Sequence, residues 1–286
     1  MSNILQVQNL SKSYGTFALK DVSFEISEGY IMGFIGPNGA GKTTTIKSIL
    51  NMVGFSSGEI NVFGLDNRGN AEKINEQIGV VMDSPFYVDD WTAKEVEGAV
   101  SPFYSRWSGD RYAPLLKKFD IDKKKKIKEL SRGMRVKLML AVALSHDAKL
   151  LILDEPTSGL DPVARDELCD LLGEFVEDES RSVLFSTHIT SDLEKIADFI
   201  TFILNGEIVF SGVKEELLGK YALVKGDIED LDEEQERLII GMRRHGGSFD
   251  GMAGIENIGK LSKSLLIEAI NLEEIIIFMN RGGKTA

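Results

Sequence analysis

Short apolar segments alternate with glycine-containing turns through the first two-thirds of the chain. Apolar residues recur near every second position in Ile4–Leu10 and Val22–Ile26, which is the period of a half-buried β-strand. Ile31–Ile35 is a continuous apolar run that ends in glycine and proline, and a helical pattern begins at Lys42. A strand, a glycine-rich turn and a helix in this order predict the start of an α/β unit.

The pattern changes between about residues 84 and 146, where apolar spacing becomes helical and aromatic residues gather. These aromatic residues are Phe86, Tyr87, Trp91, Phe103, Tyr104, Trp107 and Tyr112. We predict an inserted, mostly helical subdomain here. Leu150–Leu153 then returns to a buried strand, and a helix is expected from Pro162 with Asp161 as its N-cap.

Two further strands are predicted at Val183–Ser186 and Phe199–Leu204, and the α/β alternation stops after about residue 215. We therefore divide the chain into a main domain, 1–215, and a C-terminal accessory domain, 216–286. Within the accessory domain we expect a helix over Leu231–Met242 and a strand near Leu265–Ile267.

Composition excludes several classes of protein. The 286 residues contain 33 Lys+Arg against 45 Asp+Glu, a net charge of -12, which argues against non-specific nucleic-acid binding. The single cysteine, Cys169, excludes an internal disulfide framework and any multi-cysteine metal site. No run approaches the roughly 20 apolar residues that span a bilayer. We expect a soluble, cytoplasmic protein with no nucleic-acid partner, whose membrane contacts depend on another chain.

The turn after Ile35 contains the first residues with a predicted chemical role. Gly36-Pro-Asn-Gly-Ala-Gly-Lys-Thr43 is a complete phosphate-binding loop between a predicted strand and a predicted helix. Its glycines let backbone N–H groups converge on phosphate oxygens, and the helix N-terminus adds partial positive charge. Lys42 is predicted to neutralise the β and γ phosphates, and the Thr43 hydroxyl to bind Mg²⁺.

A second motif follows the buried strand at Leu150–Leu153. Asp154 and Glu155 stand at the end of that strand, where a carboxylate can hold Mg²⁺ directly or through water. Glu155 is then placed to polarise the attacking water as general base. A phosphate loop and an acidic strand end together predict ATP hydrolysis.

Leu130-Ser-Arg-Gly-Met134 lies between these two motifs, and with it the chain resembles the ATP-binding cassette (ABC) ATPases over about residues 3 to 215. The resemblance implies an α/β P-loop ATPase core with an antiparallel β subdomain, the inserted helical subdomain and a small C-terminal accessory domain. It assigns catalysis to Glu155 and to a switch histidine, His188. The implied ATP-binding residues are Tyr14, which stacks on adenine, Gly36, Asn38, Gly39, Ala40, Gly41, Lys42, Thr43 and Thr44.

The resemblance also implies an ATP-dependent head-to-tail dimer, which could be homo- or heteromeric. The signature residues of one subunit would close over the γ-phosphate held by the phosphate loop of the other. These residues are Ser131, Arg132, Gly133 and Met134, followed by a D-loop at Ser158 and Asp161. Hydrolysis is then completed only when two halves meet.

Two departures from the family pattern affect these expectations. Arg132 and Met134 stand where the signature commonly has Gly and Gln, while Ser131 and Gly133 are kept. Asp83 occupies the Q-loop position, where the family normally has glutamine. Asp83 still offers an oxygen ligand, so Mg²⁺ is assigned to Thr43, Asp83 and Asp154. We expect ATP binding to be kept, and the hydrolysis rate and its coupling to transport to be altered.

The function that these residues imply is the ATP-hydrolysing subunit of an ABC transporter, peripheral on the cytoplasmic side of the membrane and driving a permease on a separate chain. The signature and the C-terminal segment Glu273–Gly283 look like those of exporters of antimicrobial peptides, antibiotics or toxins. One alternative is a soluble ABC ATPase without a membrane partner. Another is a nearly inactive regulatory subunit, suggested by Asp83 and opposed by Glu155 and His188.

Overall fold

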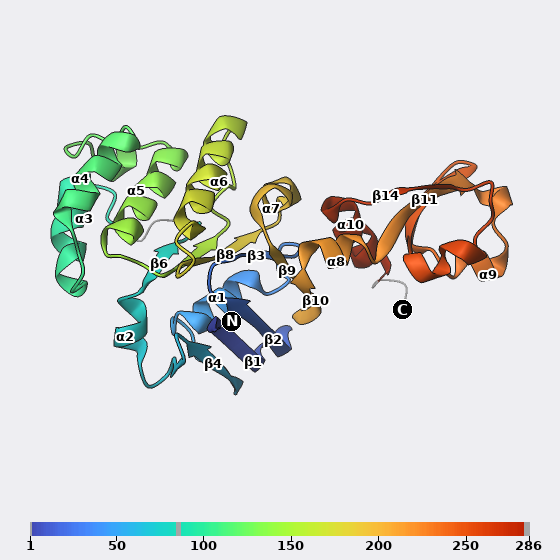
Figure 1. Ribbon diagram of the computed structural model, residues 1–286, viewed down its shortest axis with the longest axis horizontal. Coiled ribbons are helices and arrows are strands. Elements are labelled where there is room, and N and C mark those ends of the chain that lie inside the picture. Colours follow the sequence, from blue (N-terminus) through green and yellow to red (C-terminus); the bar gives the residue numbers. More distant parts are fainter. Residues whose placement is uncertain (1, 84–86, 283–286) are drawn as a thin grey trace. The chain divides into compact units, whose positions relative to one another are not determined.

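The structure, a computed structural model, describes residues 2–83 and 87–282 (Figure 1). The chain divides into two compact units, Met1–Ser211 and Gly212–Ala286. The boundary predicted at residue 215 falls inside a short helix of the second unit, α8 (Lys214–Leu218). Residue 84, where the helical subdomain was expected to begin, and Phe86 lie outside the described residues.

The first unit contains a six-stranded sheet in the order β10-β9-β3-β8-β7-β6. Its strands are β3 (Ile31–Ile35), β6 (Ile78–Val81), β7 (Leu150–Asp154), β8 (Ser182–Thr187), β9 (Phe199–Leu204) and β10 (Glu207–Val213). The five from β9 to β6 pair in parallel, and every residue of β3, β7 and β8 is buried. Continuous apolar runs suit such strands because elements cover both faces of a parallel sheet. The predicted α/β core is confirmed.

A four-stranded antiparallel sheet, in the order β2-β1-β4-β5, completes the core of this unit. Its strands are β1 (Asn3–Tyr14), β2 (Phe17–Ser27), β4 (Ser57–Val62) and β5 (Leu65–Asp66). One apolar cluster joins this sheet to α1 and the parallel sheet, through residues such as Leu5, Ile46 and Phe34. The helices outside the helical subdomain are α1 (Lys42–Ile49), α2 (Ala71–Asn75), α6 (Pro162–Val176) and α7 (Thr190–Ile196).

Helices α3 (Ala93–Val100), α4 (Gly109–Lys118) and α5 (Arg132–Ser145) form the helical part of the first unit, on the other side of the parallel sheet from β1, β2 and β4 (Figure 1). Two 3₁₀ turns, Ser101–Phe103 and Ile127–Glu129, lie between them. Thr92 and Glu95 form a capping box that begins α3. The fully buried Tyr112 joins α4 to α3 because its hydroxyl donates to the Ala93 carbonyl at 2.8 Å.

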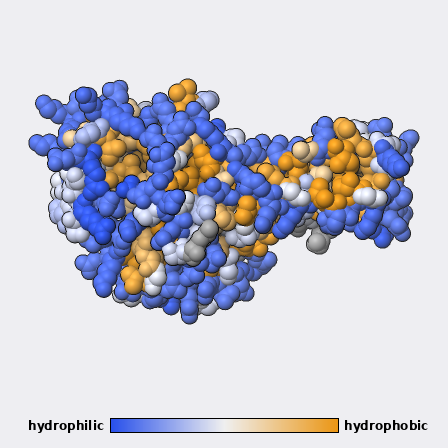
Figure 2. Space-filling view, in the orientation of Figure 1, coloured by the Kyte–Doolittle hydropathy of each residue, from blue (hydrophilic) through white to orange (hydrophobic). Residues whose placement is uncertain are grey.

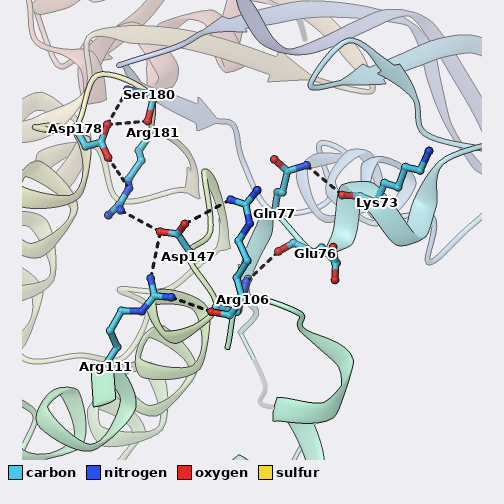
Figure 3. Close-up of polar contacts among 10 residues, drawn as sticks. Lys73, Glu76, Gln77, Arg106, Arg111, Asp147, Asp178, Ser180 and Arg181 are labelled. Carbon is cyan, nitrogen blue, oxygen red and sulfur yellow. Dashed lines mark hydrogen bonds and ion pairs between the residues drawn. The ribbon is translucent and has the colours of Figure 1, made fainter. Parts of the chain in front are cut away.

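One aspartate ties the helical part to the rest of the first unit (Figure 3). Asp147, in the turn between α5 and β7, pairs with Arg106 at 3.5 Å and with Arg111 at 3.2 Å. It also pairs at 3.3 Å with Arg181, which precedes β8. Three guanidinium groups from two parts of the unit therefore share one carboxylate, which holds α4 against the turns at the amino ends of β7 and β8.

The second unit has an antiparallel sheet in the order β12-β13-β11-β14. Its strands are β11 (Tyr221–Asp227), β12 (Ile240–His245), β13 (Ser248–Gly254) and β14 (Leu266–Ala269). Besides α8, its helices are α9 (Glu233–Glu236) and α10 (Leu272–Gly282), with 3₁₀ turns at Ile228–Asp230 and Ile255–Lys260. Apolar side chains reach the surface over β11 and β14 (Figure 2), where Leu266 and Ile267 are exposed.

The helix predicted over Leu231–Met242 is wrong. A single helical turn, α9, is capped by Asp232, and the chain then enters β12 at Ile240. Gly241 explains the change, because its φ of +66° is incompatible with a right-handed helix. A Cβ at this position would lie 2.2 Å from the Phe278 carbonyl oxygen, so the strand needs glycine to pass α10. The strand predicted near Leu265–Ile267 is present as β14.

Within residues 2–83 and 87–282, none of the helices is both long enough and apolar enough to cross a bilayer.

Candidate nucleotide site

The loop between β3 and α1 folds around the ammonium group of Lys42. Lys42 is buried, and its Nζ donates to the carbonyl of Gly36 at 2.7 Å. Gly39 and Gly41 have φ of +81° and +117°, which side chains rarely adopt. A Cβ at Gly36 would lie 2.3 Å from the Ile203 carbonyl oxygen, so this glycine is required by close packing. Of the other predicted loop residues, Ala40 is buried, Thr44 half-buried, and Asn38 and Thr43 exposed.

Asp154, at the end of β7, is brought next to the start of α1. Its carboxylate accepts hydrogen bonds from Thr43 Oγ1 at 2.8 Å and from Ser186 Oγ at 3.0 Å. Burial raises the pKa of Asp154, although these two hydrogen bonds favour the charged form. Thr43 and Asp154 thus present adjacent oxygen atoms of the hard type that Mg²⁺ prefers, and Mg²⁺ in nucleotide sites takes few protein ligands beside phosphates. This donor pair fits the predicted metal.

Glu155 turns its carboxylate toward two basic residues. Its Oε1 lies 3.1 Å from Lys42 Nζ, and its Oε2 lies 2.7 Å from His188 Nδ1. The side chain is only 15% exposed, and the residue has φ of +53°, a conformation that costs a non-glycine residue of order 1–3 kcal/mol. The structure therefore brings together Lys42, Glu155 and His188. A half-buried carboxylate at the mouth of an anion-binding loop can accept a proton from a bound water.

Tyr14 ends strand β1 and is 45% exposed, with Lys12 Nζ 4.5 Å from its ring centroid. An exposed aromatic face can stack on a planar base. Phe17, at the start of β2, was not predicted as a site residue. Its ring lies against the phosphate loop, since a Cβ at Gly41 would be 3.1 Å from Phe17 Cζ.

The signature residues lie at the start of α5. Ser131 is the N-cap, and its side chain accepts from the Met134 N–H at 3.2 Å. Gly133 faces Leu160, since a Cβ on it would lie 3.5 Å from that side chain. A hollow of about 360 Å³ is lined by the four signature residues together with Gly159, Leu160, Asp161 and the first turn of α6. The signature and the D-loop therefore border one surface.

Two residues of the D-loop also shape the chain locally. Asp161 caps α6 as predicted, accepting from Val163 N and Ala164 N at 3.0 Å each. The Ser158 N–H donates to the Glu155 carbonyl at 3.2 Å, which closes the turn after β7. The loop that begins at Glu155 thus leads directly into the helix that borders the signature.

Asp83 does not join the oxygen cluster of Thr43 and Asp154 by a hydrogen bond among the described residues. Its carboxylate forms an ion pair with Arg132 of the signature. The metal contact assigned to Asp83 therefore stays a prediction.

Ser186 is a site residue that the motifs did not reveal. It lies opposite Asp154 in the parallel register of β7 and β8, which brings its hydroxyl to the carboxylate. The available signal was its place at the end of a predicted strand, one position before Thr187 and His188.

Similar proteins identify the family. A family model described as ABC transporter matches residues 19–158. The uncharacterized ABC transporter ATP-binding protein YdbJ of Bacillus subtilis strain 168 is 31% identical over 281 residues, which cover 95% of this chain and 90% of that protein. This chain belongs to the ABC transporter ATP-binding proteins. The predicted resemblance is confirmed, and the chain is the ATPase subunit of a transporter.

Two further relatives agree with the family assignment. The lantibiotic transport ATP-binding protein SrtF of Streptococcus pyogenes is 36% identical over 209 residues, 72% of this chain and 89% of that protein. A solved structure titled as the ATP binding subunit of an ABC transporter has a TM-score of 0.68 at 29% identity, covering 75% of this chain and 91% of its own. These names do not favour the alternative of an ABC ATPase without a membrane partner.

Proposed function

We propose that this ABC ATPase binds ATP·Mg²⁺ at the Lys42 loop and drives a permease on a separate chain that exports a peptide, antibiotic or toxin. The observation that carries the proposal is the position of Glu155, a half-buried carboxylate placed between Lys42 Nζ and His188 Nδ1 beside the Thr43–Asp154 oxygen pair. Export is supported by the similarity to SrtF, whose name records lantibiotic transport.

Each residue of the site has a stated task in this proposal. Lys42 exchanges its contacts with Gly36 and Glu155 for the β and γ phosphates, which are stronger anionic partners. Thr43 and Asp154 hold Mg²⁺, directly or through water, and bound Mg²⁺ neutralises charge on the phosphates. Once Lys42 has turned to phosphate, Glu155 accepts the proton of the attacking water.

His188 acts on Glu155 and on the nucleotide. Its Nδ1 contact at 2.7 Å fixes the direction of the Glu155 carboxylate, and its ring remains 42% exposed. An exposed ring beside the site can reach a γ-phosphate that the loop presents. We assign adenine binding to the exposed face of the Tyr14 ring. Phe17 packs against the phosphate loop and supports it.

The signature surface completes the site only in a dimer. Ser131 and Gly133 border the hollow beside the D-loop, and in the proposed head-to-tail pairing they close over the γ-phosphate held by the second subunit. Hydrolysis then depends on two chains meeting, which ties the chemistry to movement of the permease. Two copies of this chain, or this chain and a related one, form the pair.

The permease is expected to dock on the aromatic surface of the helical part. Phe103 is 78% exposed at the turn between α3 and α4, and it lies near Tyr104 and Trp107 in the sequence. Among the exposed large apolar side chains of residues 2–83 and 87–282, Phe103 has the largest exposed fraction, so it is the residue at which we test this docking. This docking places the chain on the cytoplasmic face of the membrane as a peripheral subunit.

Co-purification from detergent-solubilised membranes of the native cell tests the proposal. The tagged full-length chain should retain an integral membrane protein, and ATP hydrolysis by the complex should exceed that of the chain alone. Phe103→Asp should lose the membrane protein and keep ATP binding. Val209→Asp, a matched change at another exposed apolar residue, should retain it. A wild-type chain that retains no membrane protein contradicts the proposal.

A further inference from the structure

Two of the positions at which this chain departs from the ABC pattern contact each other. Asp83 stands at the Q-loop position and Arg132 in the signature, 49 residues apart, and their side chains form an ion pair. The family pattern has neutral residues, glutamine and glycine, at these positions. The two charges are of opposite sign, so each departure provides the partner of the other.

Arg132 lies where the signature, the Q-loop position and the D-loop come together. It is the first residue of α5, directly after the N-cap Ser131. Its stem runs beside Gly159, where a Cβ would lie 3.2 Å from Arg132 Cδ and 3.3 Å from Nε. Gly159 has φ of +71°, a backbone conformation that favours glycine. The guanidinium thus lies between the Q-loop position and the D-loop.

The ion pair is accessible and can be exchanged. The side chains of Arg132 and Asp83 are 45% and 56% exposed, and Arg132 lines the hollow of about 360 Å³ beside the D-loop. An exposed ion pair contributes little to stability, and a polyphosphate carries more negative charge than one carboxylate. A triphosphate that reaches this hollow therefore competes well for the guanidinium.

We infer that Asp83 is an exchangeable counter-ion for Arg132. In the separate chain Asp83 holds the guanidinium, and in the ATP-bound dimer Arg132 leaves Asp83 for the triphosphate bound to a second copy of this chain. The inference rests on the head-to-tail pairing of the proposed function. Asp83 acts as a positioning residue that opposes closure and sets the ATP concentration at which two copies associate.

The expected effects follow from the strength of exposed and charge-assisted contacts. Without the Asp83 charge, neither copy has to break an exposed ion pair when the dimer forms. This is worth about 2- to 5-fold in affinity per copy and about 4- to 25-fold for a symmetric dimer. Removing the Arg132 guanidinium deletes a charge-assisted contact to phosphate in each copy, at least about 10-fold per copy. The two substitutions therefore act in opposite directions on dimer formation.

The experiment measures ATP-dependent dimerisation by analytical ultracentrifugation in the full chain carrying Glu155→Gln, which prevents turnover. Four proteins are compared: this parent, Asp83→Asn, Arg132→Ala and the double variant. Asp90→Asn is the matched control, because it removes the same charge from another exposed ion pair, with Lys126 and Lys128. ATP affinity of the separate chain is measured at concentrations below dimerisation, with and without Mg²⁺.

We expect Asp83→Asn to tighten the dimer, Arg132→Ala to weaken it, and Asp83→Asn to have no effect when Arg132 is absent. Asp90→Asn should behave as the parent. The inference gives the Asp83 carboxylate to Arg132 in place of Mg²⁺, so Asp83→Asn should leave the ATP affinity of the separate chain and its Mg²⁺ dependence unchanged. The inference is overturned if Asp83→Asn fails to tighten the dimer or acts equally without Arg132. It is also overturned if Asp83→Asn changes the Mg²⁺ dependence, since Asp83 then acts on the metal. A parent that binds ATP without dimerising contradicts the proposed pairing itself.

Discussion

His146 provides a direct test of the packing between the helical part and the parallel sheet. It is 1% exposed at the end of α5, and its ring stacks on Tyr104 with centroids 3.8 Å apart and planes 15° from parallel. Its Nδ1 lies 3.3 Å from the Glu76 carbonyl oxygen, so this nitrogen carries the proton of the neutral ring. Burial lowers the pKa of His146 from 6.5 to about 4. The folded chain therefore keeps this ring neutral at pH values where an unfolded chain would charge it.

The sign and size of the effect follow from this pKa. Above pH 6.5 the ring is neutral in both states and has no effect on the pH dependence of stability. Below pH 6.5 the unfolded chain takes up a proton that the folded chain binds only near pH 4, so the free energy of unfolding falls as pH falls. The loss is about 2 kcal/mol at pH 5 and about 3 kcal/mol below pH 4, at 1.36 kcal/mol for each pKa unit.

The comparison is between wild type and His146→Phe, which keeps the ring stack on Tyr104 and removes the titrating group. Urea unfolding is followed by tryptophan fluorescence, and both tryptophans of the chain, Trp91 and Trp107, belong to the predicted helical subdomain. At pH 7.5 we expect the variant to be about 1 kcal/mol less stable because it loses the contact with Glu76. Between pH 7.5 and pH 5 the wild type should lose about 2 kcal/mol more than the variant. Equal losses in the two proteins would refute a buried neutral His146.

Three further predictions concern Lys42 in the nucleotide site, the division of the chain into two units, and the ion pairs of Asp147. Lys42→Ala should lower ATP affinity in calorimetry by about 10-fold or more, because a buried charge-assisted contact to phosphate is lost; unchanged affinity would remove Lys42 from the site. A chain ending at Val213, which keeps β10 whole, should fold and bind ATP; a soluble product without ATP binding would show that residues 214–286 contribute to the site. Asp147→Asn should lower the free energy of unfolding, measured by urea titration, by about 1–2 kcal/mol, because three arginines lose their shared carboxylate. A variant as stable as the wild type would show that these ion pairs contribute nothing.

Much of the core and the nucleotide site could be predicted because their signals are local in the sequence. A buried strand, a glycine-rich loop and a helix beginning at Lys42 follow one another without interruption. The acidic pair Asp154 and Glu155 directly follows the apolar run of β7. Parallel pairing then brings these segments to one sheet edge, since the carboxyl ends of neighbouring parallel strands lie together.

The remaining features depend on contacts between distant residues. Asp147 and its arginines are spread from Arg106 to Arg181, and no local pattern relates them. The pairing of Asp83 with Arg132 likewise joins two loops that the sequence separates. In the second unit, the acidic segment before Ile240 has helix-forming residues, yet its helix ends after one turn at Glu236. From Ile240 the chain is a strand, because it pairs with β13 and Gly241 is left-handed.

In the proposed mechanism Glu155 activates water for ATP hydrolysis at the Lys42 loop, and the decisive comparison is between the wild type and Glu155→Gln. Phosphate release and ATP affinity are measured for both proteins in the presence of Mg²⁺. The variant should bind ATP as tightly as the wild type and release phosphate about 10²- to 10⁴-fold more slowly, so that the ATP-bound dimer accumulates. Phosphate release by the variant at a rate close to that of the wild type would contradict it.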